Sequence, residues 1–175
     1  MTGINIRKIT TDDTDLIVKW RNTQHVREHF IYRKEFDRAT HENWLKNVIS
    51  EGKAVQFIIY ETEDGFPIGS VYFTKINNSE HSSEFGIFIG EAEAAGRGYG
   101  TEAAGMALAY AFEHMKMESI YLRVFTDNIS AIKSYEKTGF VRYDVLHDVM
   151  CTDGEKKDMY LMKISKEEYQ GKELC

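Results

Sequence analysis

A glycine-rich turn between an expected strand and an expected long helix constrains this sequence more than any other segment. The turn reads Ala-Gly-Arg-Gly-Tyr-Gly-Thr over residues 95–101, and a helical pattern of apolar residues follows it over residues 101–115. Glycines allow positive φ angles and a close approach of ligand to backbone, and a helix start carries a partial positive charge. The turn therefore predicts an anion site suited to phosphate or pyrophosphate, to which Arg97 could add a charge and Thr101 a hydroxyl.

Two familiar phosphate-binding loops do not match this turn. The P-loop has Lys followed by Ser or Thr after its last glycine, whereas Gly100 is followed by Thr101 and Glu102. The dinucleotide fingerprint has the spacing G-x-G-x-x-G in the first βαβ unit, whereas the spacing here is G-x-G-x-G, late in the chain. Taken alone, a glycine cluster can also be a turn that simply joins a strand to a helix.

The remaining segments predict an α+β fold with a mixed, mostly antiparallel sheet of about seven strands, flanked by about four helices. Short polar turns join the middle strands, so these should pair antiparallel. Strands are expected at residues 4–8, 55–60, 67–76, 83–89, 119–124, 141–146 and 157–164. Helices are expected to begin near residue 11 and to cover residues 40–49, 101–115 and 129–137, with Thr40 as a cap. We expect one domain over residues 1–175, with residues 165–175 frayed.

Composition narrows the classes of function. The chain has 175 residues, 22 Lys and Arg against 28 Asp and Glu, and a formal charge of −6. This balance argues against nucleic acid as a partner, and no apolar run reaches the ~20 residues of a membrane span. No secretion signal is visible, and Cys151 and Cys175 form no disulfide framework or metal pattern. His25 and His29 lack a third ligand. We therefore expect a cytoplasmic protein with neither a metal nor a membrane partner.

A second motif follows the glycine turn at a fixed separation. Residues 128–140 fit the pattern N-x-x-A-x-x-x-Y-E-K-x-G-F, and Ala95-x-x-Gly98-x-Gly100 is similar to Q/R-x-x-G-x-G/A. With both motifs in order, residues 4–164 resemble the GCN5-related N-acetyltransferase (GNAT) superfamily. Ala95 departs from the usual Gln or Arg, which removes a side chain but leaves the backbone cradle intact.

The resemblance implies acetyl-coenzyme A as the acetyl donor. Its pyrophosphate would bind the backbone amides of the glycine turn, and its pantetheine arm would pair with a strand that splays from its neighbour. The cofactor-binding residues implied in this way are Ile87, Phe88, Ile89, Arg97, Gly98, Tyr99, Gly100, Thr101 and Asn128.

Attack of an amine on a thioester needs a base, donors for the oxyanion and an acid for the leaving thiolate. Tyr135 is the expected acid, because it lies seven residues after Asn128, about two helical turns, on the same side of the helix. The alternative for Tyr135 is a core residue. Glu84 is the expected base and points to the strand face opposite Phe85, although it could also be a solvated or substrate-binding acid. His81, at the preceding turn, is a weaker candidate.

The acceptor is expected to be a small-molecule amine or a protein N-terminal amine. Arginines alternate with aromatic residues in Trp-Arg-Asn at 20–22 and near Val-Arg at 26–27, and the stretch 41–44 reads His-x-x-Trp. With residues 68–77, these segments are similar to acetyltransferases of UDP-linked 4-amino-4,6-dideoxy sugars. The C-terminal half is equally similar to ribosomal-protein alanine and spermidine acetyltransferases. The charge of −6 and acids such as Glu80 and Glu84 suit a polyamine, whereas the arginines suit a nucleotide sugar. A non-enzymatic acyl-CoA-binding protein is the alternative of another class, and a homodimer is a further expectation.

Overall fold

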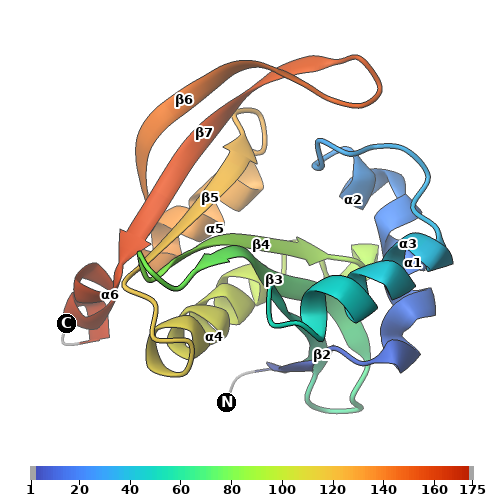
Figure 1. The fold of residues 1–175 in the computed structure, drawn as a ribbon, viewed down its shortest axis with the longest axis horizontal. Helices are drawn as coiled ribbons and strands as arrows, with labels where there is room; N and C mark the ends of the chain where they lie inside the picture. The colour runs from blue at the N-terminus through green and yellow to red at the C-terminus, as the bar shows by residue number, and fades with distance from the viewer. Residues whose placement is uncertain (1–2, 174–175) are drawn as a thin grey trace.

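The computed structural model describes residues 3–173 and contains one seven-stranded sheet with the order β1-β2-β3-β4-β5-β7-β6 (Figure 1). All neighbouring strands pair antiparallel except β4 and β5, which pair parallel. The expected mixed, mostly antiparallel sheet is thereby confirmed. The strands are β1 (Ile4–Lys8), β2 (Val55–Glu61), β3 (Pro67–Asn77), β4 (Ser82–Ile89), β5 (Ser119–Phe125), β6 (Val141–Met150) and β7 (Lys156–Ser165).

Six α-helices occur in the described part of the chain, two more than the sequence predicts. They are α1 (Thr14–Asn22), α2 (Gln24–Arg27), α3 (Arg38–Trp44), α4 (Tyr99–Glu113), α5 (Ile129–Thr138) and α6 (Lys166–Glu173). No helix within residues 3–173 is long and apolar enough to cross a membrane.

Three predictions about the helices are wrong. Asp37, not Thr40, caps α3, because its carboxylate accepts a hydrogen bond from the Thr40 amide at 2.7 Å. Helix α4 begins at Tyr99, two residues earlier than predicted, because Gly98 is its N-cap with φ of 86°. Residues 165–175 were expected to fray, yet Lys166–Glu173 form α6. The Glu168 carboxylate there accepts hydrogen bonds from both the amide and the hydroxyl of Ser165, while Cys175 lies outside the described residues.

Helices cover both faces of the sheet. Successive residues of β2 show this, since Phe57 and Ile59 belong to the core cluster under α4 and α5, whereas Ile58 packs with α1 on the opposite face. Trp20 of α1 is fully buried, and its ring meets Phe88 edge-on with centroids 6.1 Å apart. Trp20 therefore anchors α1 in the core.

The sheet opens between β4 and β5. These two strands share only three residue pairs, from Ser82↔Ser119 to Glu84↔Tyr121. Beyond Glu84, β4 continues to Ile89 and β5 to Phe125 without pairing with each other. Backbone groups of β4 that face this gap therefore have no strand partner, which is the splayed arrangement that the sequence resemblance implies.

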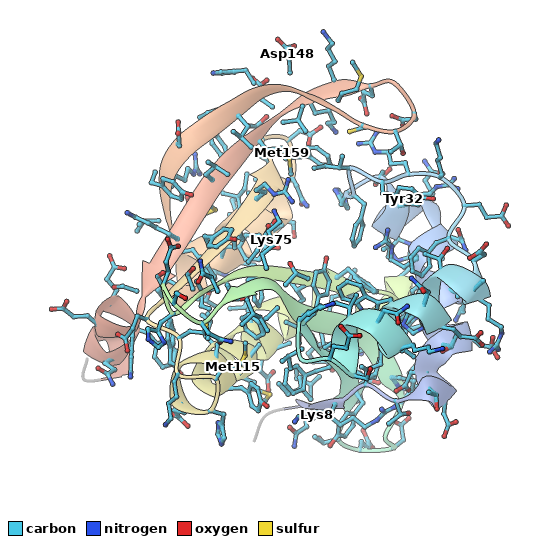
Figure 2. All side chains as sticks on the ribbon, in the orientation of Figure 1. Lys8, Tyr32, Lys75, Met115, Asp148 and Met159 are labelled. Atoms are coloured by element: carbon cyan, nitrogen blue, oxygen red, sulfur yellow. The ribbon has the colours of Figure 1, made fainter. Side chains whose placement is uncertain are left out.

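The β6–β7 hairpin reaches across this gap to the segment that follows α2 (Figure 1). At its tip, the Thr152 amide donates to the Ile31 carbonyl at 3.0 Å, and the Arg33 guanidinium pairs with Asp153 and Glu155. Figure 2 shows Tyr32 and Met159 on the two sides that this contact joins. The β6–β7 hairpin therefore covers the gap between β4 and β5.

Candidate active site

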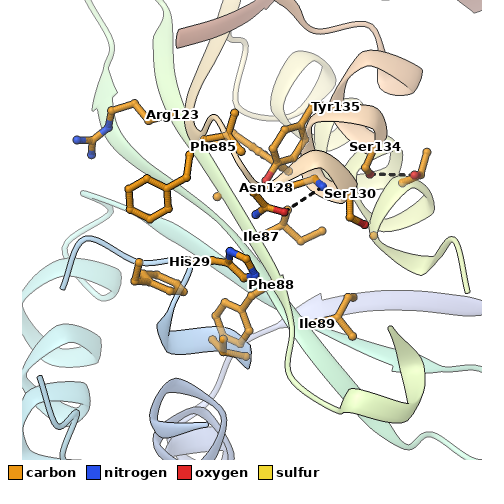
Figure 3. A pocket seen from close by; sticks show the side chains of 18 of the residues that line it. His29, Phe85, Ile87, Phe88, Ile89, Arg123, Asn128, Ser130, Ser134 and Tyr135 are labelled. Atoms are coloured by element: carbon orange, nitrogen blue, oxygen red, sulfur yellow. Dashed lines mark hydrogen bonds between the residues drawn. The ribbon is translucent and has the colours of Figure 1, made fainter. Parts of the chain in front are cut away.

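A cavity of about 670 Å³ occupies the gap between β4 and β5 (Figure 3). It extends from the glycine turn, on the α4 and α5 side, to residues of the α2 segment on the other side. Most of the site residues predicted from the sequence line this cavity, although they come from three separate segments. Those brought together are Glu84, Ile87, Phe88, Ile89, Gly98, Gly100, Thr101, Asn128 and Tyr135.

The glycine turn forms one end of the cavity. Gly96 and Gly98 have φ of 75° and 86°, and a Cβ added at either would meet no atom within 4 Å. The turn is therefore open on its ligand side. The first turns of α4 and α5 both contribute lining residues here, and amides of a first helical turn lack partners within the helix. This end is suited to an anion.

Arg97 and Tyr99 have side chains that turn away from the cavity. The Arg97 guanidinium pairs with the Glu61 carboxylate at 2.8 Å, and the Tyr99 hydroxyl donates to the same oxygen at 3.0 Å. The prediction of a direct charge from Arg97 is therefore wrong. These two side chains instead fasten the glycine turn to β2, and only their backbone amides remain available to a ligand.

Helix α5 supplies the charge that Arg97 does not. Lys133 lines the cavity with no ion pair among the described residues, and the Ser134 hydroxyl is 2.9 Å from that of Thr101. Four lining residues follow the spacing i, i+3, i+4, i+7 of one helix face, and this spacing is already visible in the sequence: Ser130, Lys133, Ser134 and Lys137.

Asn128 caps α5 and also faces the cavity. Its side-chain oxygen accepts a hydrogen bond from the Ala131 amide at 3.3 Å. Because this oxygen is engaged, the group that Asn128 can offer a ligand is its side-chain NH₂. The cofactor-binding role that the sequence resemblance implies for Asn128 is therefore that of a hydrogen-bond donor.

Tyr135 projects from α5 into the cavity, beside β4 (Figure 3). Its ring meets Phe85 edge-on with centroids 6.0 Å apart, and only 7% of the residue is exposed. Burial raises the pKa of its phenol well above the usual value. The hydroxyl has no hydrogen-bond partner within residues 3–173, so it is a protonated donor free to bind a ligand.

Glu84 also reaches the cavity, but with its charge already compensated. One carboxylate oxygen accepts from the Arg123 Nε at 2.7 Å, and the other lies 2.5 Å from the Lys75 Nζ. Figure 2 shows Lys75 on the side of the sheet that faces the hairpin. Taking up a proton would weaken both ion pairs, so this carboxylate is better suited to hold Arg123 in place than to act as a base.

Two histidines to which the sequence assigned no role line the end of the cavity beside the α2 segment. This end, opposite the glycine turn, is called the acceptor end. A ring nitrogen of His25 lies 3.0 Å from the Gly90 carbonyl oxygen, and His29 points toward β4 (Figure 3). Burial lowers the pKa of the His29 imidazole below 6.5, which leaves it neutral at pH 7. His81, the weaker candidate from the sequence, lies on an exposed turn and does not line the cavity. Spacing alone could not reveal His29, because its neighbours in the cavity are distant in sequence.

Tyr72 of β3 forms part of the same wall, and its ring lies directly over Gly86. Desolvation raises the pKa of its phenol to about 12. A Cβ added to Gly86 would lie 2.3 Å from a Tyr72 ring carbon.

We expect Gly86→Ala to displace the Tyr72 ring, because the added methyl group and the ring cannot share this space. The free energy of unfolding, measured with urea, should fall by about 1–3 kcal/mol. Gly105→Ala is the matched control: nothing lies within 4 Å of its Cβ position in α4, so it should be neutral or stabilising by up to ~1 kcal/mol. Equal stability changes in the two variants would contradict this close approach.

No group of three or more His, Cys, Asp or Glu side chains among the described residues is arranged to hold a metal ion.

Comparison with known proteins shows the family of the chain. The model of the acetyltransferase (GNAT) domain family matches residues 4–141. The chain is 29% identical over 156 residues to acetyltransferase PseH of Campylobacter jejuni, covering 89% of this chain and 88% of that protein. It is 26% identical over 168 residues to spermidine N(1)-acetyltransferase of Vibrio cholerae, covering 95% of each. The structure of V. cholerae spermidine N-acetyltransferase in complex with CoA and spermine superposes with a TM-score of 0.88 at 24% identity, covering 96% of this chain and 98% of that one.

The fold that carries the gap between β4 and β5 and the glycine turn at the start of α4 is thus shared with acetyltransferases. The chain belongs to the acetyltransferase (GNAT) domain family. It is an N-acetyltransferase whose acetyl donor is acetyl-coenzyme A, as the sequence resemblance implies.

Proposed function

We propose that this enzyme acetylates the amino group of a nucleotide-linked amino sugar by direct attack in a ternary complex. The donor would bind along β4, with its pyrophosphate at the amides of residues 97–101 and its arm beside Ile87, Phe88 and Ile89. The acceptor would enter from the side of α1 and α2. The sequence resemblance to acetyltransferases of UDP-linked 4-amino sugars supports this choice.

The charge of the cavity wall is the observation that carries the proposal. Glu84 is the only carboxylate among its described lining residues, and Arg123 and Lys75 already neutralise it. Glu80, which suited a polyamine in the sequence, does not line the cavity. A polycation would therefore meet no uncompensated acid among these lining residues, which favours an acceptor that does not carry several positive charges.

The chain's own residues supply the proton transfers. Acetyl-coenzyme A supplies a thioester whose carbonyl carbon the neutral acceptor amine attacks. His29, neutral at pH 7, accepts the proton that the amine loses, directly or through water. Those β4 amides within residues 87–89 that face the gap rather than β3 donate to the carbonyl oxygen as it becomes negative. Tyr135 donates its phenolic proton to the departing thiolate sulfur, and Glu84 holds Arg123 at the acceptor end.

A panel of amines tests the acceptor. Free thiol release from acetyl-coenzyme A should be fastest with a UDP-linked 4-amino-4,6-dideoxy sugar. Spermidine and a peptide with an N-terminal alanine represent the two alternatives suggested by the relatives and the sequence. A higher kcat/KM for either of these would overturn the nucleotide-sugar proposal but not the acetyltransferase class.

Lys133→Gln should weaken donor binding, because the lysine adds positive charge beside the glycine turn. We expect the dissociation constant of acetyl-coenzyme A, measured by calorimetry, to rise about three- to tenfold, an effect that shrinks at high salt. Lys46→Gln, an exposed site away from the cavity, serves as the control. A dissociation constant that stays the same in Lys133→Gln would remove this lysine from the donor site.

We also propose that the enzyme self-associates. One related structure of V. cholerae spermidine N-acetyltransferase is dodecameric, and β6 is an edge strand that exposes Val141 and Tyr143. Light scattering at micromolar concentration should give a mass of at least two chains, and a monomer would contradict the proposal. The cytoplasmic location stays a prediction from the sequence.

A further inference from the structure

Arg21 of α1 is packed between aromatic rings without an acidic partner. Its guanidinium carbon lies 3.5 Å from the ring centroid of Phe30 and 4.9 Å from that of Phe36. Its Nε is sealed from solvent and donates to no acceptor. Six of the other seven arginines of the described chain pair with carboxylates, namely Arg7, Arg33, Arg38, Arg97, Arg123 and Arg142.

An unpaired, desolvated cation is unfavourable in a folded protein. Burial lowers the pKa of the Arg21 guanidinium, although an arginine remains charged at neutral pH. The two rings offer no hydrogen-bond acceptor, so the N–H donors at the edge of the guanidinium have no partner among the described residues. A phosphate matches this edge because it accepts two parallel hydrogen bonds.

The surroundings of Arg21 connect it to the cavity. Phe30, on which it stacks, lines the acceptor end. Tyr72 and Tyr32 also lie near the Arg21 guanidinium, and both residues line the cavity. An anion held by Arg21 would therefore lie at the edge of the acceptor end.

We propose that Arg21 forms an anion subsite that binds a phosphate group of the acceptor. This inference rests on the proposed function, since a nucleotide sugar carries a diphosphate, whereas spermidine and an N-terminal amine carry none. Arg21 would then determine specificity by binding a part of the acceptor remote from the reacting amine.

Binding of UDP to the enzyme saturated with coenzyme A tests the subsite directly, because coenzyme A occupies the donor end. Arg21→Met retains apolar contact with Phe30 but removes the charge, and should weaken UDP binding at least about tenfold in calorimetry. Arg21→Lys should give an intermediate affinity. Affinity for acetyl-coenzyme A should stay within about twofold in both variants, which shows that they fold. Arg38→Met, at an exposed arginine of α3, should bind UDP as the wild type does.

Steady-state kinetics separate recognition from folding. For Arg21→Met, KM for the UDP-linked amino sugar should rise at least about tenfold with little change in kcat, while KM for the same amino sugar without UDP stays constant. Absence of UDP binding to the wild type, unchanged binding to Arg21→Met, or equal losses with both sugars would overturn the subsite. If UDP binds through Arg21 but the UDP-linked amine is not acetylated, the proposed acceptor fails and the subsite stands.

Discussion

Tyr135→Phe is expected to lower kcat by about 10²–10³-fold while leaving the affinity for acetyl-coenzyme A within about twofold. This substitution removes only the phenolic hydroxyl, and the ring keeps its edge contact with Phe85. Burial holds the pKa of Tyr135 above its usual range, so the hydroxyl stays protonated through neutral and moderately alkaline pH. Stopped-flow or steady-state thiol release measures kcat, and calorimetry measures donor binding.

Tyr143→Phe provides the matched control for this experiment. Tyr143 lies on β6 with 49% of its surface exposed and does not line the cavity, so the same loss of one hydroxyl should leave kcat unchanged. If Tyr135→Phe also retains full kcat, Tyr135 is a core residue and the acid lies elsewhere. If donor affinity falls in step with kcat, its role is in binding.

His29→Gln should lower kcat/KM by about 10²-fold and remove the acidic limb of the pH profile. The imidazole accepts a proton only in its neutral form, so activity is lost as pH falls through its pKa. Because burial lowers that pKa from 6.5, the limb in the wild-type enzyme should lie below pH 6.5. The profile of kcat/KM against pH from 5 to 9 measures it.

Two further variants make the assignment of the base specific. His147→Gln changes a histidine on β6 that is 72% exposed in its side chain, and should keep both rate and profile. Glu84→Gln should raise the acceptor KM by releasing Arg123, yet keep the acidic limb. If the limb instead disappears in Glu84→Gln and persists in His29→Gln, Glu84 is the base, as the sequence first suggested.

The strands and the two motif-bearing segments could be predicted because their signals are local. Alternation in residues 4–8 and the helix-forming pattern before Gly139 depend on nearby residues alone. The early start of α4 was missed because Gly98 adopts a left-handed conformation as an N-cap. The C-terminal helix was missed because part of its support is tertiary, through contact of Tyr169 with Phe112.

The candidate site was predictable on its donor side and much less so on its acceptor side. The glycine turn and Asn128 to Tyr135 form continuous motifs, so the sequence places them. In contrast, the engagement of Glu84 by Arg123, and of Arg97 by Glu61, depends on strands that meet only in the folded chain. The spacing of residues in the sequence does not predict these ion pairs. The ion pairs nevertheless determine which charged side chains remain available to a substrate.

The gap between β4 and β5 beyond Glu84 leaves one edge of each strand unpaired. These two edges lie within the sheet rather than at its outer strands. Exposed edges invite strands of other chains to add to a sheet and so promote aggregation. Here the hairpin tip, held to residues 31–33, and helix α5 border the gap. These elements lie over the unpaired edges and keep strands of other chains from reaching them. The enclosure that serves acetyl transfer therefore also protects the sheet from unwanted pairing.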